Sequence, residues 1–148
     1  MNDLAPILLA EDDPKDAELT LAALARNNLV NRVILVNDGV EVLEYLRREG
    51  AFKGRAPGNP VVVLLDIQMP RMNGLETLRE IRGDARLKDL PVVILTSSRE
   101  ERDLVEGYGL GVNAYVVKPV DFEHFTEAVS QIALFWTNVN EPPPSVAK

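Results

Sequence analysis

The chain has 148 residues, of which 46% are hydrophobic and 26% charged, and this is the size and composition of one globular domain. It contains no cysteine, which excludes a disulfide framework, a thiolate zinc site and cysteine catalysis. His124 is the one histidine of the sequence, so a metal site built from several histidines is excluded as well.

Charge and hydropathy exclude two further classes of protein. The formal net charge is −7 and no basic run is longer than Arg47-Arg48, which disfavours binding to a nucleic-acid backbone. The apolar runs are far shorter than the ~18 residues of a membrane span. The start, Met1-Asn2-Asp3, lacks the basic and apolar regions of a signal peptide. We therefore expect a cytoplasmic protein without membrane or nucleic-acid partners.

Short apolar runs rich in β-branched residues alternate along the chain with segments of helical spacing. Continuous runs of four or five such residues predict strands that are buried on both faces. The runs cover residues 7–10, 33–36, 61–65, 92–95 and 114–117. The segments with apolar residues every three or four positions predict helices, and they cover residues 14–27, 40–49, 74–82, 99–109 and 121–136.

This alternation predicts an α/β fold of five βα units, (βα)5, wound right-handed into a doubly wound five-stranded parallel sheet. The strand order 2-1-3-4-5, which is the flavodoxin-like arrangement, is the common solution at this size. We expect residues 1–136 to form this domain and the Pro-rich residues 137–148 to form an extension. Residues 50–60, rich in Gly and Pro, predict a long, flexible surface loop.

Polar residues with complementary chemistry follow four of the predicted strands, at the sheet edge where parallel α/β proteins bind ligands. They are Glu11-Asp12-Asp13, Asp66, Thr96 and Lys118. Clustered carboxylates repel each other unless a cation neutralises them. Oxygen ligands without histidine or cysteine suit Mg²⁺. Such a metal beside a carboxylate, a hydroxyl and an ammonium group indicates phosphoryl transfer, with the Asp66 carboxylate as the nucleophile.

Each of these residues also has a structural interpretation. Asp13 precedes Pro14, a typical helix N-cap arrangement, so we expect Asp13 to be a cap more often than a ligand. That assigns the metal to Asp12, with Glu11 acting through water. Asp66 and Thr96 could likewise be caps of the helices that follow them, and an isolated Lys118 would be a solvated lysine. The coincidence at four strand ends favours the functional interpretation.

The residues at these strand ends resemble the receiver domains of two-component response regulators. The segment 64–74, Leu-Leu-Asp-Ile-Gln-Met-Pro-Arg-Met-Asn-Gly, is similar to the family's phosphoacceptor motif. The segment 116–119, Val-Val-Lys-Pro, is similar to its conserved-lysine motif. The acidic run that ends at Asp13 and the pair Thr96-Ser97 extend the resemblance over residues 5 to about 136.

The resemblance implies a role for each site residue. Asp66 would accept a phosphoryl group from a sensor histidine kinase, and the protein would not be an enzyme beyond transferring and releasing this group itself. Mg²⁺, or Mn²⁺ in its place, would be bound by Asp12, Asp66, the backbone carbonyl of Gln68 and, through water, Glu11. Lys118 would pair with the carboxylate and then with the phosphoryl group.

The resemblance also implies how the phosphoryl group is read and removed. Thr96 and Tyr115 would form the conformational switch, and the peptide bond before Pro119 would be cis. Gln68 and Ser98 would tune the lifetime of the phosphoryl group. Two alternatives remain open: a receiver-like scaffold that is never phosphorylated, and a haloacid-dehalogenase-like phosphatase. The second requires an aspartate two residues after its nucleophile, and position 68 is Gln.

The last predicted helix carries apolar residues on several faces, including Phe135 and Trp136 near its end. Packing against the sheet explains part of this pattern, and a homodimer through this helix explains the rest. The end of the helix, the Pro-rich extension and the loop 50–60 resemble single-domain regulators that accompany bacterial phytochromes. We therefore expect a phytochrome-type kinase among the partners, together with a downstream protein whose identity the sequence does not encode.

Overall fold

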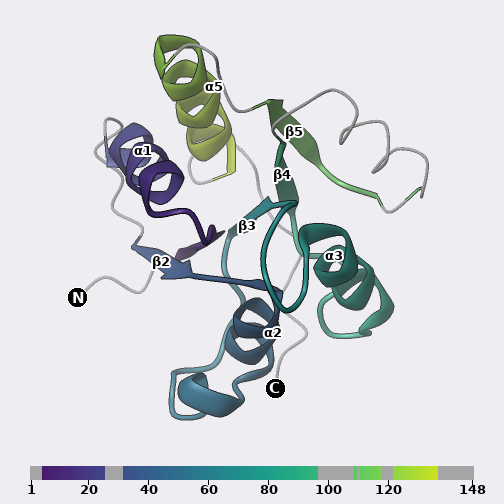
Figure 1. Cartoon of the computed structure of the whole chain (residues 1–148). Coiled ribbons are helices and arrows are strands. Elements are labelled where there is room, and N and C mark those ends of the chain that lie inside the picture. The colour runs from purple at the N-terminus through teal and green to yellow at the C-terminus, as the bar shows by residue number, and fades with distance from the viewer. Residues whose placement is uncertain (1–4, 26–31, 97–108, 110, 118–121, 137–148) are drawn as a thin grey trace.

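The computed structural model of the chain describes residues 5–25, 32–96, 109, 111–117 and 122–136. Strands and helices alternate along it (Figure 1). The strands are β1 (Ile7–Ala10), β2 (Val33–Val36), β3 (Val62–Asp66), β4 (Val92–Thr96) and β5 (Ala114–Val117). The helices are α1 (Pro14–Ala25), α2 (Gly39–Arg47), the 3-10 turn η1 (Gly50–Phe52), α3 (Gly74–Gly83) and α5 (Phe122–Leu134).

The strands form one parallel sheet in the order β2-β1-β3-β4-β5. Ala10, the last residue of β1, pairs with Leu65 of β3, and Asp66 pairs with Leu95 of β4. This register places the carboxyl ends of β1 and β3 beside each other. The α/β class and the parallel sheet are confirmed, whereas the helix expected at residues 99–109 falls almost wholly outside the described residues.

Helices cover both faces of the sheet. Helices α1 and α5 lie side by side on one face, and α2 and α3 lie on the other (Figure 1). The side chains of β1, β3 and β4 alternate between the two hydrophobic clusters that result. Leu8 and Leu65 pack toward α2 and α3, and Ile7 and Leu64 pack toward α1 and α5. Burial on both faces explains why the strands are continuous apolar runs.

Strand β2 departs from the expected burial on both faces. Val33 and Ile34 are only partly buried, and Leu35 is 42% exposed. The reason is position, because β2 forms an edge of the sheet and has only β1 as a neighbour. Burial on both faces was therefore a wrong prediction for this strand.

The loop over residues 50–60 is connected to α2 by side-chain contacts. The Arg55 side chain donates hydrogen bonds to the backbone carbonyls of Tyr45, Ala56 and Gly58, at 2.7, 2.7 and 3.0 Å. Its guanidinium also lies 4.0 Å from the centre of the Tyr45 ring, which packs edge-on against Phe52. Burial, and to a lesser degree the nearby charge of Arg48, lower the pKa of Arg55, and Tyr45 opposes this. Hydrogen bonds of Arg55 thus act together with the packing of Phe52 against the core to hold this loop.

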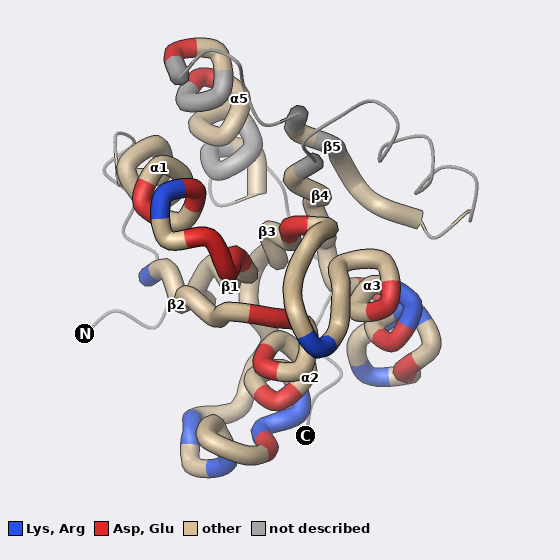
Figure 2. Tube along the Cα trace, in the orientation of Figure 1, with Lys and Arg blue, Asp and Glu red and all other residues tan. Residues whose placement is uncertain are grey.

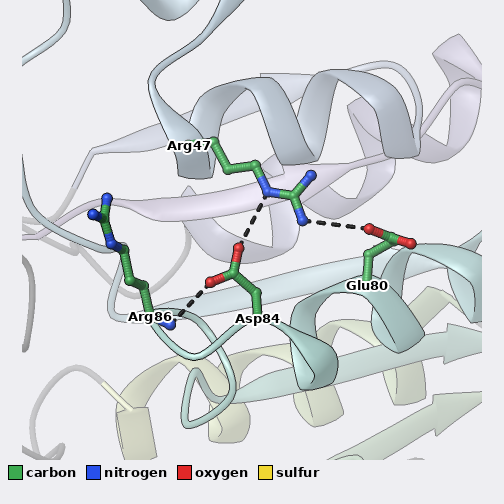
Figure 3. A network of polar contacts seen from close by, with 4 residues as sticks. All are labelled: Arg47, Glu80, Asp84 and Arg86. Atoms are coloured by element: carbon green, nitrogen blue, oxygen red, sulfur yellow. Dashed lines mark hydrogen bonds and ion pairs between the residues drawn. The ribbon is translucent and has the colours of Figure 1, made fainter.

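Helices α2 and α3 are also joined at the surface. Arg47, at the end of α2, forms ion pairs with Glu80 and Asp84, each at 3.3 Å (Figure 3). The Asp84 carboxylate accepts a second hydrogen bond from the backbone N–H of Arg86.

No helix among the described residues is both long and apolar enough to cross a membrane.

Candidate metal centre

Three carboxylates meet at the carboxyl edge of the sheet. Glu11 and Asp12 follow β1 directly, and Asp66 is the last residue of β3. One oxygen of each carboxylate lies within 4.8 Å of the others. Figure 2 shows the acidic stretch where β1 leads into α1. The structure therefore brings together the three side chains that the sequence assigned to a metal ion.

The cluster is held from the sheet side and open toward solvent. Glu11 and Asp66 are 1% and 6% exposed, whereas Asp12 is exposed. The backbone N–H of Glu11 donates to the carbonyl of Val36 at 3.0 Å, which continues the β1–β2 pairing beyond the strand. The Glu11 carboxylate accepts the Asp13 N–H at 3.1 Å. Two carboxylates of the cluster are thus buried, and the third, that of Asp12, faces solvent.

Asp13 takes the helix-capping alternative. One of its carboxylate oxygens accepts the backbone N–H groups of Lys15 and Asp16, at 2.8 and 3.2 Å, and its carbonyl accepts the Ala17 N–H at 2.9 Å. These are the bonds of an N-cap residue at the start of α1. Asp13 thus satisfies the first turn of the helix, and the carboxylate that joins the cluster is that of Asp12.

Asp66 does not cap the helix that follows it. The N-cap of α3 is Asn73, which forms a reciprocal capping box with Glu76, with both hydrogen bonds at 2.9 Å. The loop from β3 to α3 closes through a hydrogen bond from the Gly74 N–H to the Ile67 carbonyl at 2.8 Å. A Cβ atom at Gly74 would collide with the carbonyl oxygen of Asp66. The loop therefore passes tightly behind Asp66, whose carboxylate belongs to the cluster.

The remaining predicted residues lie in part outside the described structure. Gln68 is exposed in the β3–α3 loop. Thr96 is the last residue of β4, and Tyr115 of β5 pairs with Ile94 of β4. The side chains of Thr96 and Tyr115 fall outside the described structure. Ser98, Lys118 and Pro119 lie outside the described residues altogether. Phe135 is 44% exposed and packs edge-on against the partly buried Trp136, with ring centres 4.9 Å apart.

The sequence interpretation missed two residues at this edge of the sheet. Asp38, just after β2, is 4% exposed and is the N-cap of α2, accepting the Glu41 N–H at 2.9 Å. Arg71 of the β3–α3 loop donates to both Asp38 oxygens, at 2.7 and 3.2 Å. Burial acts to raise the pKa of Asp38, but the Arg71 hydrogen bond, two backbone N–H groups and the Arg71 charge outweigh it and lower this pKa. Inspecting the residues after β2, as was done for the other strands, would have found Asp38.

The donor set suits a small hard cation. All three groups are carboxylates, which are the ligands that Mg²⁺ and Mn²⁺ share, and no nitrogen or sulfur donor belongs to the cluster. Carboxylates held this close repel one another, and a divalent ion would remove that repulsion. The residues present therefore fit a metal ion of this class.

The fold and this acidic edge define a class of protein. The model of the response regulator receiver domain family matches residues 7–130, and the chain belongs to that family. The fold is accordingly the flavodoxin-like α/β fold of receivers, built on a parallel sheet. Membership of this family also rules out the haloacid-dehalogenase alternative.

Within the family, the chain is similar to regulators associated with phytochromes. The solved structure of the bacteriophytochrome response regulator RtBRR is 56% identical, covers 95% of this chain and 85% of its own, and has a TM-score of 0.81. The phosphorylated cyanobacterial phytochrome response regulator RcpA is 35% identical, with coverages of 95% and 99% and a TM-score of 0.84.

A third relative is the response regulator Rcp1 of Synechocystis sp. (strain ATCC 27184 / PCC 6803 / Kazusa). It is 33% identical over 88% of this chain and 87% of its own sequence. A solved structure of the Mn²⁺-bound form of Rcp1 covers 95% of this chain and 99% of its own, with 31% identity and a TM-score of 0.83.

Proposed function

We propose that the chain is a response regulator that accepts a phosphoryl group on Asp66 from a phytochrome-type histidine kinase. The observation that carries this proposal is the meeting of Glu11, Asp12 and Asp66 within 4.8 Å at the carboxyl edge of a receiver fold. The similarity to RtBRR and to phosphorylated RcpA supports the kinase class and the phosphorylation. We assign the receiver domain to residues 1–136 and the extension to residues 137–148.

The metal of the proposed site is Mg²⁺, with Mn²⁺ as a substitute. Asp12 and Asp66 bind it directly, with the backbone carbonyl of Gln68, and Glu11 contributes through water. The acidic donor set and the Mn²⁺-bound form of Rcp1 support this assignment. When bound, the ion offsets the negative charge that the carboxylate and the phosphoryl group bring together.

In the proposed reaction, a carboxylate oxygen of Asp66 attacks the phosphorus of a phosphohistidine. The O–P bond forms as the N–P bond breaks, and the released histidine nitrogen takes up a proton. Lys118 neutralises the phosphoryl oxygens and Thr96 donates a hydrogen bond to them. Water later attacks the phosphorus and releases inorganic phosphate, which regenerates the Asp66 carboxylate.

Three further elements of the proposal concern signalling. Thr96 and Tyr115 change conformation together when the phosphoryl group arrives, and a cis peptide bond before Pro119 places Lys118. Gln68 and Ser98 set the phosphoryl lifetime by admitting or excluding water. The phosphorylated form then acts on a downstream protein.

The test is phosphorylation of the purified full chain with acetyl phosphate and Mg²⁺, followed by phosphate-affinity electrophoresis. Wild type is expected to label, and Asp66→Asn is expected to lose labelling completely. Asp89→Asn removes one exposed carboxylate away from the cluster and is the charge-matched control, expected to label normally. Normal labelling of Asp66→Asn would place the phosphoacceptor elsewhere. A folded wild type that binds Mg²⁺ but never labels would be a scaffold.

We also propose a homodimer through α5 and the aromatic pair that follows it. The 44% exposure of Phe135 supports this, because large exposed apolar side chains often mark an interface. Sedimentation of wild type and Phe135→Ser over a range of concentrations tests it, and a wild type that remains monomeric at high concentration contradicts it.

A further inference from the structure

We propose that the ion pair between Asp38 and Arg71 is a positioning contact for the metal centre. It fastens the β3–α3 loop to the turn between β2 and α2, and thereby fixes the part of the loop that contains Gln68. This inference rests on the proposed Mg²⁺ site and adds to it two residues that touch neither the metal nor the phosphoryl group.

The pair joins a buried carboxylate to an exposed guanidinium group. The Asp38 side chain is 5% exposed, whereas that of Arg71 is 55% exposed. Asp38 is immobilised by its role as the N-cap of α2, where it accepts the Glu41 N–H at 2.9 Å. Arg71 then approaches with two donors, at 2.7 and 3.2 Å, which fixes direction as well as distance.

A second contact lies beside the ion pair and joins the same two segments. The Gly39 N–H donates to the Met72 carbonyl at 3.1 Å. A Cβ atom at Gly39 would collide with Oγ1 of Thr77 and lie 2.7 Å from the Met72 carbonyl oxygen. Turn and loop thus touch backbone to backbone, at a position where only glycine leaves room.

The backbone conformation at Arg71 is unusual for a residue with a side chain. Its φ is +63°, in the left-handed region that favours glycine and costs energy for other residues. Glycine would relieve this strain but would leave the Asp38 carboxylate without its partner. An arginine at a left-handed position is therefore consistent with selection for the ion pair.

Of the two fastened segments, the β3–α3 loop leaves the acidic cluster directly, and the end of β2 is hydrogen-bonded to it. The β2 end is tied to the cluster by the hydrogen bond from the Glu11 N–H to the Val36 carbonyl. The loop starts from Asp66, and Gln68 lies between Asp66 and Arg71 in the chain. The sheet ladder fixes the strand ends but not the loop beyond them. The Asp38–Arg71 pair supplies a restraint on the loop at its far side.

The test uses two substitutions that fit the local backbone conformation. Asp38→Asn keeps a good N-cap residue and removes the charge. Arg71→Gly suits the left-handed backbone and removes the guanidinium. The control is Arg47→Gln, which removes the ion pairs to Glu80 and Asp84 at the opposite end of α2. Two quantities are measured on each full chain: the Mg²⁺ dissociation constant by titration calorimetry, and amide hydrogen exchange of residues 67–72 in metal-free buffer.

Both pair variants are expected to weaken Mg²⁺ binding by about tenfold, the lower end of the effect of groups that orient metal ligands. The exchange of residues 67–72 is expected to speed up in both, and neither quantity is expected to change in Arg47→Gln. The double variant Asp38→Asn/Arg71→Gly is expected to bind Mg²⁺ about as well as either single variant, because both remove the same contact.

The outcomes separate this inference from the function on which it rests. Unchanged exchange in both variants overturns the loop contact even if Mg²⁺ binds normally. Faster exchange with unchanged Mg²⁺ affinity overturns the positioning role. A wild type that binds no Mg²⁺ overturns the proposed metal site, and the exchange measurements then decide the loop contact by themselves.

Discussion

The guanidinium of Arg82 donates two hydrogen bonds to the backbone carbonyl of Gly111, from Nε at 3.1 Å and from Nη2 at 2.7 Å. The same side chain donates to the carbonyls of Lys88 and Leu90, at 3.0 and 2.8 Å, and to the Asn113 side chain at 3.2 Å. One arginine at the end of α3 therefore joins the α3–β4 turn to the chain entering β5.

Replacing Arg82 is expected to destabilise the fold. Burial lowers the pKa of Arg82, with Asp89 opposing the shift, so its charge is retained only at a cost that the hydrogen bonds offset. Arg82→Ala leaves several carbonyls without their donor and is expected to lower the free energy of unfolding by about 2–3 kcal/mol in urea titrations. Arg82→Lys is expected to recover little, because an ammonium group lacks the planar fork.

The control for this prediction is Arg86→Ala. The Arg86 side chain is exposed, and its backbone N–H, which binds Asp84, survives the substitution. A change within about 0.5 kcal/mol is expected. An Arg82→Lys variant as stable as wild type would show that charge alone, and not the geometry of five hydrogen bonds, is what this position needs.

Gly74 is expected to be irreplaceable at the back of the metal centre. An alanine Cβ there would collide with the Asp66 carbonyl oxygen and lie 2.8 Å from the Ile67 Cα, both of which are backbone atoms that cannot move aside. We expect Gly74→Ala to cost about 1–3 kcal/mol, the range for overpacking, and to weaken Mg²⁺ binding through displacement of Asp66.

The matched control is the other glycine of the same helix. Gly83 has no atom within 4 Å of its ideal Cβ position. Gly83→Ala is therefore expected to leave stability unchanged or to raise it, by up to about 1 kcal/mol from helix propensity. Equal unfolding midpoints for the two alanine variants would contradict the close packing behind Asp66.

Much of this architecture follows from the sequence for a physical reason. Strands covered on both faces must be continuously apolar, so the runs at β1, β3 and β4 predicted the buried sheet directly. Polar residues at the ends of such runs must meet at one edge, so Glu11, Asp12 and Asp66 were found together. Local pattern sufficed here because the pattern itself reports burial and strand direction.

The rest depends on contacts between distant segments, which no local pattern encodes. The exposure of Leu35 follows from the edge position of β2, and strand order is a property of the whole sheet. The hydrogen bonds from Arg55 to the carbonyls of Tyr45 and Gly58 are not encoded in the Gly and Pro content of residues 50–60. The pairing of Asp38 with Arg71, 33 residues apart, requires the loop conformation to be known.

Stability at acid pH is expected to depend on Asp38. Its pKa lies below the ordinary 3.8, because the Arg71 contact and backbone N–H groups outweigh the opposing effect of burial. The folded state thus favours the ionised form. The stabilisation that the ionised Asp38 carboxylate gives to the fold is complete above about pH 4. It is lost as the pH falls through the lowered pKa of Asp38 in the folded protein.

Urea unfolding of wild type and Asp38→Asn from pH 7 to pH 2.5 measures this contribution. At neutral pH the variant is expected to be less stable by about 1.5–3 kcal/mol, the value of hydrogen bonds to a charged group. The difference should shrink below pH 4, as Asp38 of the wild type becomes protonated. A difference that stays constant down to pH 2.5 would mean that the charge of Asp38 contributes nothing, and Glu18→Gln, which removes an exposed carboxylate of α1, serves as the control.

Mg²⁺ is expected to reverse the order of stability of wild type and Asp12→Asn. Without metal, Asp12 lies within 4.8 Å of two other carboxylates, so its neutralisation should stabilise the protein by about 1 kcal/mol. With metal at about one hundred times its dissociation constant, wild type gains about 2.7 kcal/mol from binding, and a variant lacking one ligand gains less. Urea titrations in chelator and in excess Mg²⁺, at equal ionic strength, measure both states.

The control is Asp13→Asn, which keeps the cap of α1 and lies outside the cluster. Mg²⁺ is expected to raise its free energy of unfolding by as much as that of wild type. An Asp12→Asn variant that is less stable than wild type in chelator would refute mutual repulsion within the cluster.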